Sequence, residues 1–142
     1  MSSVKNTLQV GYVVSIDTNI LLRMILGDVK VQITAIRSLL EKHDIVAVSD
    51  LTITEVVYVL EKSQGVSRAL ICEFINSLLS NQHLNINRPL FQRVLPLYEK
   101  HRTESFNDCC LSVYATLNNQ VPLYTFDKKM ARDLPGVELV QQ

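Results

Sequence analysis

Residues 12–19 read Tyr-Val-Val-Ser-Ile-Asp-Thr-Asn, a short apolar run that ends in three polar side chains. An apolar run of this length that is rich in valine is typical of a strand buried on both faces. The segment 20–26 follows at once and is apolar except for Arg23, which predicts a buried helix directly after the strand. Because a buried strand that leads straight into a helix is the repeating unit of parallel sheets, this stretch indicates an α/β fold.

The same alternation of strand and helix continues along the chain. Apolar spacing predicts further strands at 45–48, 84–86, 122–125 and 137–140. It predicts further helices at 33–40, 53–64, 67–79, 106–117 and 128–134, and one more that begins at Pro89. Pro96 falls within the helix that begins at Pro89 and is expected to kink or break it. This order predicts a three-layer α/β/α fold with a mostly parallel central sheet of four to five strands.

The size and charge of the chain indicate one domain without general affinity for polyanions. The 142 residues are 47% hydrophobic, which is ample for a single core. Residues 1–11 are polar with scattered apolar residues, so we expect a flexible N-terminal extension and a single domain over 12–142. Fourteen Lys and Arg balance fourteen Asp and Glu, so any nucleic acid must be held by local groups.

The cysteines indicate a reducing compartment. Cys72, Cys109 and Cys110 are odd in number and lack the spacing of metal ligands, so we expect buried free thiols. No segment has the apolar run of a signal peptide or approaches the ~20 apolar residues of a membrane span. We therefore expect a soluble, cytoplasmic protein without a membrane partner.

Four acidic residues stand where predicted helices begin: Asp17, Glu55, Asp108 and Asp127. Helix capping can explain each one singly, because two stand at N-cap positions and the other two follow Thr52 and Ser105 at the spacing of a capping box. Their apolar surroundings and their places after strands favour a shared site, since active sites of alternating strand-helix chains form at that edge of the sheet.

A shared site for four carboxylates requires compensation of their charge. Two unit charges ~5 Å apart repel by ~3 kcal/mol at an effective dielectric of ~20. A shared cation removes this repulsion, and protonation of one or two acids is the alternative. Oxygen ligands select Mg²⁺ or Mn²⁺, whereas no histidine stands in the ligand spacing that zinc would need. Such a cation would bind a phosphate oxygen and lower the pKa of a bound water, so we expect hydrolysis of a phosphodiester.

The surroundings of the four acids resemble a known family. Residues 14–28 closely resemble the opening of PIN domains, especially VapC-type toxins of type II toxin-antitoxin pairs. Residues 54–61, 106–108 and 125–129 resemble the second, third and fourth motifs, and the match runs from about Val13 to Val140. The resemblance implies a PIN-fold endoribonuclease that uses Mg²⁺ or Mn²⁺ to cut single-stranded or looped RNA with water. Asp17 and Asp108 would be the principal metal ligands, Glu55 would ligate or orient water, and Asp127 would complete the site or hold a second metal.

The resemblance also implies supporting residues and partners. Asn19 and Thr125 would hydrogen-bond the carboxylates and the waters around the metal. A homodimer and a cognate antitoxin are implied, with an apolar antitoxin segment in a groove among the first helices. Near the motifs, Arg102, Lys128 and Lys129 could form a modest phosphate-binding patch, although solvated helix faces explain them as well. A neutral chain with such a patch favours a selective substrate, structured RNA with an exposed loop.

Three other functions remain open. A housekeeping RNA-processing nuclease would have the same site. A PIN-like scaffold could bind a protein without catalysis, although it would have no reason to keep four repelling acids. A phospho-acceptor domain that uses Asp17 would need a second acid beside it and a lysine at the end of a later strand, which the sequence lacks.

Overall fold

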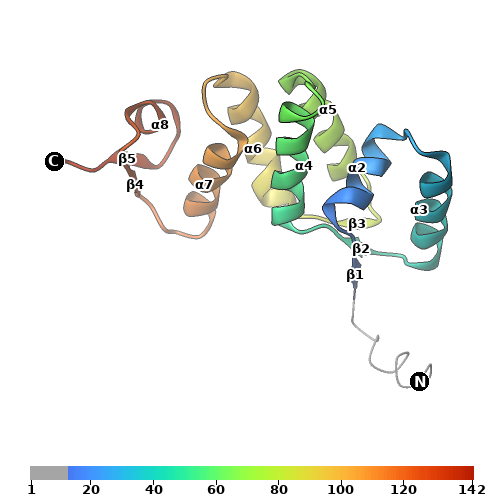
Figure 1. Ribbon diagram of the computed structural model, residues 1–142. Helices are drawn as coiled ribbons and strands as arrows, with labels where there is room; N and C mark the ends of the chain where they lie inside the picture. The colour runs from blue at the N-terminus through green and yellow to red at the C-terminus, as the bar shows by residue number, and fades with distance from the viewer. Residues whose placement is uncertain (1–12) are drawn as a thin grey trace. The chain divides into compact units, whose positions relative to one another are not determined.

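The computed structural model describes residues 13–142, so the N-terminal extension expected at 1–11 lies outside the described residues. Within them, five strands and seven helices follow one another in the order that the sequence predicted (Figure 1). The strands are β1 (Val14–Ser15), β2 (Val46–Ala47), β3 (Leu84–Asn85), β4 (Leu123–Thr125) and β5 (Val137–Leu139). The helices are α2 (Thr18–Leu26), α3 (Lys30–Lys42), α4 (Asp50–Lys62), α5 (Arg68–Leu79), α6 (Arg88–Lys100), α7 (Phe106–Leu117) and α8 (Lys128–Asp133).

Every strand pair among these elements is parallel. Strand β2 lies between β1 and β3, with Val46 opposite Val14 and Leu84. Strand β4 pairs with β5, where Thr125 lies opposite Leu139. The predicted α/β class with parallel strands is therefore confirmed. The strands form a group of three and a group of two, where one sheet of four to five was expected. Each is two or three residues long and contributes few ladder hydrogen bonds.

The chain divides into two compact units. The N-terminal unit contains the residues up to Val56 together with Leu78–Ile86. The C-terminal unit contains Val57–Ser77 and Asn87–Gln142. The boundaries fall inside α4, inside α5 and between β3 and α6. Two of the four acids lie in each unit: Asp17 and Glu55 in the first, Asp108 and Asp127 in the second.

In the N-terminal unit, α2 and α3 lie side by side (Figure 1). Helix α2 buries Leu21 and Leu22, and α3 buries Ile36. Helix α2 ends at Gly27, whose φ of 62° is the left-handed conformation that glycine adopts without strain. These contacts fix the helix that begins directly after Asp17.

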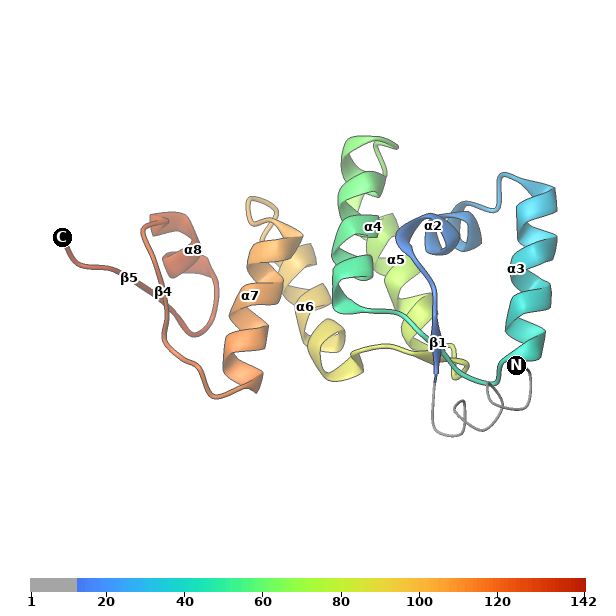
Figure 2. The same cartoon turned by 60° about the horizontal axis from the view of Figure 1, so that its bottom comes forward.

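In the C-terminal unit, α6 and α7 lie side by side (Figure 2). Three of their aromatic rings are in contact. The ring of Phe106, the first residue of α7, stacks on Phe91 at 6.1 Å between centroids and meets Tyr98 edge-on at 5.2 Å. Tyr98 is fully buried and donates its hydroxyl hydrogen to Glu61 of α4. Aromatic pairs add about 0.5–1.5 kcal/mol to the free energy of area burial, so this cluster anchors the start of α7.

Pro96 does not break α6, so of the kink or break expected from the sequence the break does not occur. The helix continues through Pro96 to Lys100. A proline inside a helix costs about 3 kcal/mol. Burial of one large apolar side chain contributes about 1.5–3 kcal/mol, and α6 buries five side chains: Leu90, Phe91, Val94, Leu95 and Tyr98. The packed face therefore outweighs the lost backbone hydrogen bond.

All three cysteines are buried and free of disulfides, as the sequence predicted. No helix in residues 13–142 combines the length and the apolar character that crossing a membrane would require.

Candidate functional site

Two of the acidic motifs meet in the N-terminal unit. The parallel register of β1 and β2 brings their carboxyl ends to the same edge, and α2 and α4 both begin beyond that edge. The hydroxyl of Thr18, the first residue of α2, donates a hydrogen bond of 2.9 Å to Oε2 of Glu55 in α4. The first and second motifs are therefore in direct contact through side chains.

Asp17 and Asp127 are helix caps, as the simpler interpretation of the sequence predicted. Oδ1 of Asp17 accepts a hydrogen bond of 3.0 Å from the N–H of Ile20 at the start of α2. Oδ1 of Asp127 accepts one of 3.0 Å from the N–H of Met130 at the start of α8. Each of these bonds uses only Oδ1 of its carboxylate, so a capping aspartate can still offer Oδ2 to a cation.

Glu55 is not a capping residue, which corrects the capping-box interpretation at this position. Helix α4 already begins at Asp50, so Glu55 lies more than one turn inside it. The hydroxyl of Ser49 accepts the 3.1 Å hydrogen bond from the N–H of Thr52 at the helix start. Glu55 is exposed and contacts Thr18, so its place in the sequence has no capping explanation.

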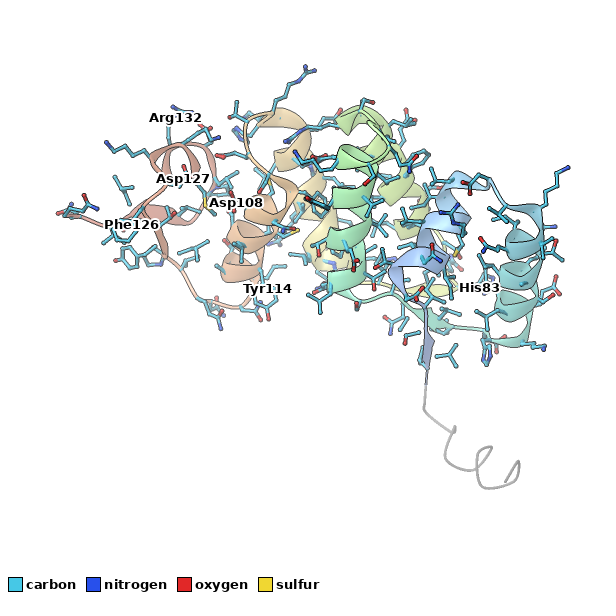
Figure 3. All side chains as sticks on the ribbon, in the orientation of Figure 1. His83, Asp108, Tyr114, Phe126, Asp127 and Arg132 are labelled. Atoms are coloured by element: carbon cyan, nitrogen blue, oxygen red, sulfur yellow. The ribbon has the colours of Figure 1, made fainter. Side chains whose placement is uncertain are left out.

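Asp108 lies in the first turn of α7, beneath a cap that the sequence predicted. The hydroxyl of Ser105 accepts a hydrogen bond of 3.0 Å from the N–H of Asp108. Asp108 is half-buried, and the partial positive charge at this helix end stabilises its carboxylate. Asp108 and Asp127 can be followed on α7 and at the start of α8 in Figure 3.

A fifth acid, Glu104, lies near these two and was missed by the sequence analysis. Its side chain is only 1% exposed, and neither carboxyl oxygen has a hydrogen-bond partner among the described residues. Burial raises the pKa of the Glu104 carboxyl, the Lys129 ammonium lowers it, and the charges of Asp127, Asp133 and Asp108 raise it further. The sequence carries no signal of this burial, because the segment around Glu104 is a polar loop.

Arg68 of α5 holds the loop that carries Glu104. Its guanidinium donates hydrogen bonds of 2.8 Å to the carbonyl of Tyr98 and 2.6 Å to the carbonyl of Glu104, with a longer one of 3.3 Å to His101. The same guanidinium lies 4.1 Å from the centroid of the Tyr98 ring. Such stacking and charged hydrogen bonds make Arg68 the anchor of the α6–α7 loop.

The predicted supporting residues have varied surroundings. Oγ1 of Thr125 accepts a hydrogen bond of 3.0 Å from the N–H of Asp127 and so shapes the turn that presents this acid. Asn19 is exposed and lines a hollow between α2 and α3. Lys129 donates a hydrogen bond of 2.7 Å to the carbonyl of Thr103, whereas Lys128 and Arg102 are exposed.

The acids suit a hard cation by their chemistry. In the part of the chain that the structure describes, no group of three or more His, Cys, Asp or Glu side chains is gathered as metal ligands. Two acids lie in each unit, so the convergence of all four remains a prediction. The ligand atoms that these side chains offer are all carboxylate oxygens, which are the atoms that Mg²⁺ and Mn²⁺ prefer. The oxygens of the buried Glu104 side chain also have no hydrogen-bond partner among residues 13–142.

One of the comparisons with known proteins finds a match over most of the chain. The family model of the PIN domain matches residues 14–133. No curated protein matches the chain. Because the matched segment covers most of the sequence and includes all four predicted acids, this chain belongs to the PIN domain family.

Proposed function

We propose that this PIN domain protein is a Mg²⁺- or Mn²⁺-dependent endoribonuclease. PIN domains are generally nucleases that act on RNA. The main support from the geometry is Glu55, which caps no helix and accepts a hydrogen bond from Thr18, directly after Asp17. Carboxylates of metal sites are commonly oriented by such hydrogen bonds, and Thr18 is next to Asp17 in the sequence.

The four acids would divide the work of the site. Asp17 and Asp108 would be the principal holders of the cation, and Asp127 would complete the set. When bound, the cation would polarise the phosphate and lower the pKa of a water molecule. Glu55, positioned by Thr18, would orient the attacking water, and Thr125 would keep Asp127 in place through its bond to the Asp127 N–H.

The net charge of the chain bears on the class of RNA that it would cleave. The net charge of the chain is zero, so general attraction to phosphates is weak. The exposed side chains of Lys128 and Arg102 offer a small local patch. We propose a selective substrate, structured RNA with an exposed loop whose backbone can enter the site.

We propose further that the nuclease is the toxin of a toxin-antitoxin pair and a homodimer. A hollow of about 400 Å³ between α2 and α3 supports the partner. It is lined by Asn19, Ile20 and Arg23 of α2 and by Gln32, Ala35, Ile36 and Leu39 of α3. An apolar antitoxin segment would fill this hollow, and a basic side chain of it would reach the acids. A housekeeping RNA-processing nuclease is the alternative.

The nuclease is tested by cleavage of total cellular RNA by purified protein, with cleavage sites mapped by sequencing. We expect cleavage with Mg²⁺ or Mn²⁺, none in excess chelator, and none by the Asp17→Asn/Asp108→Asn double variant. Asp44→Asn, which neutralises an exposed acid elsewhere in the N-terminal unit, should cleave like the wild type. Undiminished cleavage by the double variant would contradict the site, and absence of cleavage by metal-loaded wild type would favour the scaffold.

The toxin role needs a separate experiment. Induced expression should arrest growth, and co-expression of the reading frame adjacent to its gene should relieve the arrest. Ala35→Arg, which places a charged side chain in the hollow, should abolish this relief and leave the arrest. Normal growth on induction of active nuclease would favour the housekeeping enzyme. The homodimer is tested by sedimentation equilibrium, in which we expect twice the mass of one chain.

A further inference from the structure

Glu104 is a buried carboxyl group to which the proposed nuclease site gives no role. Its side chain is 1% exposed, and both carboxyl oxygens lack a hydrogen-bond partner within residues 13–142. Buried carboxylates in proteins are almost always paired or hydrogen-bonded, because an unmade bond is costly. A buried carboxyl group without hydrogen bonds therefore suggests that a ligand binds there or that the residue has a function.

The main chain, not the carboxylate, holds Glu104 in its buried position. Its N–H donates a hydrogen bond of 3.0 Å to the carbonyl of His101, and its own carbonyl accepts the 2.6 Å bond from Arg68. Ser105, the next residue, is fixed as the cap of α7. The loop therefore presents the Glu104 side chain at a defined place without help from the side chain itself.

The charged groups around the carboxylate are mostly acids. Asp108, Asp127 and Asp133 act on it electrostatically, and Lys129 is the leading favourable charge. Asp133 is paired with Arg132 at 2.8 Å, and the Lys129 ammonium donates to the carbonyl of Thr103. Two of the acids that act on Glu104, Asp108 and Asp127, belong to the proposed site.

We propose that Glu104 is a fifth acidic residue of the cation site, on the side of Asp108 and Asp127. The inference rests on the proposed function, which assigns a divalent cation to these two acids. Mg²⁺ and Mn²⁺ keep several waters when carboxylates bind them, and those waters are hydrogen-bond donors. Glu104 would accept hydrogen bonds from those waters, which would give its oxygens the donors that residues 13–142 do not supply.

The test is Mn²⁺ affinity, measured by calorimetric titration without RNA. Glu104→Gln keeps the shape of the side chain and removes its charge, and we expect it to weaken Mn²⁺ binding by at least about tenfold, the usual effect of losing such a partner. Glu138→Gln, the same change at an exposed position of β5, should bind Mn²⁺ like the wild type. Lys129→Met removes the nearby ammonium and should not weaken binding of a cation.

The outcomes separate this inference from the nuclease itself. Wild-type affinity in Glu104→Gln would overturn the role of Glu104 and leave the nuclease standing. Absence of Mn²⁺ binding by the wild type would overturn both. Weakening by Lys129→Met as large as by Glu104→Gln would show that the two residues serve only as a structural ion pair, which also overturns the role.

A measurement on the wild-type chain keeps the inference testable if the variant does not fold. Fe²⁺ replaces Mg²⁺ in oxygen sites, and with ascorbate and peroxide it cuts the backbone close to where it is bound. We expect cuts within residues 103–108 and near Asp127, located by mass spectrometry. Cuts near Asp17 and Glu55 that spare 103–105 would overturn the assignment of Glu104.

Discussion

Thr18 donates a hydrogen bond of 2.9 Å to Oε2 of Glu55, a residue 37 positions later in the sequence. Thr18 opens α2 directly after Asp17, and Glu55 lies inside α4, so the bond links the first two acidic motifs. Parallel pairing of β1 and β2 makes the contact possible, because it places the starts of both helices beyond one edge. A hydroxyl in this position favours one rotamer of an otherwise exposed glutamate.

We predict that Thr18→Val lowers kcat/KM for RNA cleavage by about 10–100-fold, since loss of a residue that orients a site carboxylate has effects of this size. Thr18→Ser keeps the donor and should stay within a few-fold of the wild type. The exposed bond contributes only about 1 kcal/mol, so melting temperatures should change little. Equal rates for the valine and serine variants would show that the hydroxyl does not position Glu55.

Substitutions at Asp17 separate capping from catalysis. Asn caps helices as well as Asp, so Asp17→Asn should keep wild-type stability and lose cleavage. Asp17→Ala also removes the acceptor for the Ile20 N–H and should cost about 1 kcal/mol in the free energy of unfolding. Ser67→Ala removes the acceptor for the Leu70 N–H at the start of α5 and should lose similar stability but retain cleavage. Urea unfolding and RNA cleavage measure both properties, and activity that simply follows stability would contradict the prediction.

The sequence predicts the order of elements well, because local signals decide it. Helix α7 begins and ends where its apolar spacing indicates, at Phe106 and Leu117. Gly65 follows α4 with a φ of 61°, the left-handed conformation in which many helices end. The caps at Asp17 and Asp127 are equally local. Pro96 is the exception, since the burial that keeps α6 intact depends on packing between helices.

The site is less accessible from sequence, because its new members are defined by packing. Glu104 reads as one more polar loop residue, yet it is buried. Arg68 reads as a solvated residue at a helix start, yet it binds three carbonyls and an aromatic ring. Thr18 belongs to a recognisable motif, but its partner Glu55 is distant in the chain. Contacts between distant polar groups leave no periodic pattern from which to predict them.

Arg68 should contribute more to the stability of the fold than an exposed arginine does. Arg68→Met keeps the aliphatic stem but removes hydrogen bonds to the carbonyls of Tyr98, His101 and Glu104 and the contact with the Tyr98 ring. We expect a loss of about 2–4 kcal/mol in the free energy of unfolding, measured in urea, from charged hydrogen bonds and stacking. Arg93→Met at an exposed position of α6 should stay within about 0.5 kcal/mol. Equal effects of the two changes would mean that the loop has no anchor at Arg68.

The buried thiols predict both reactivity and pH dependence. Burial, with the Glu99 charge, raises the pKa of the Cys72 thiol to about 11, and burial raises that of Cys109 to about 11. Unfolded thiols ionise near ~8.5. Above that pH the unfolded chain therefore binds fewer protons than the folded one, and the free energy of unfolding should fall as the pH rises toward 11.

At pH 8 both thiols remain protonated and covered, so iodoacetamide should label them in urea but not in the folded protein, as read by mass spectrometry. Rapid labelling of Cys72 without urea would show that α5 opens far more often than its buried face implies.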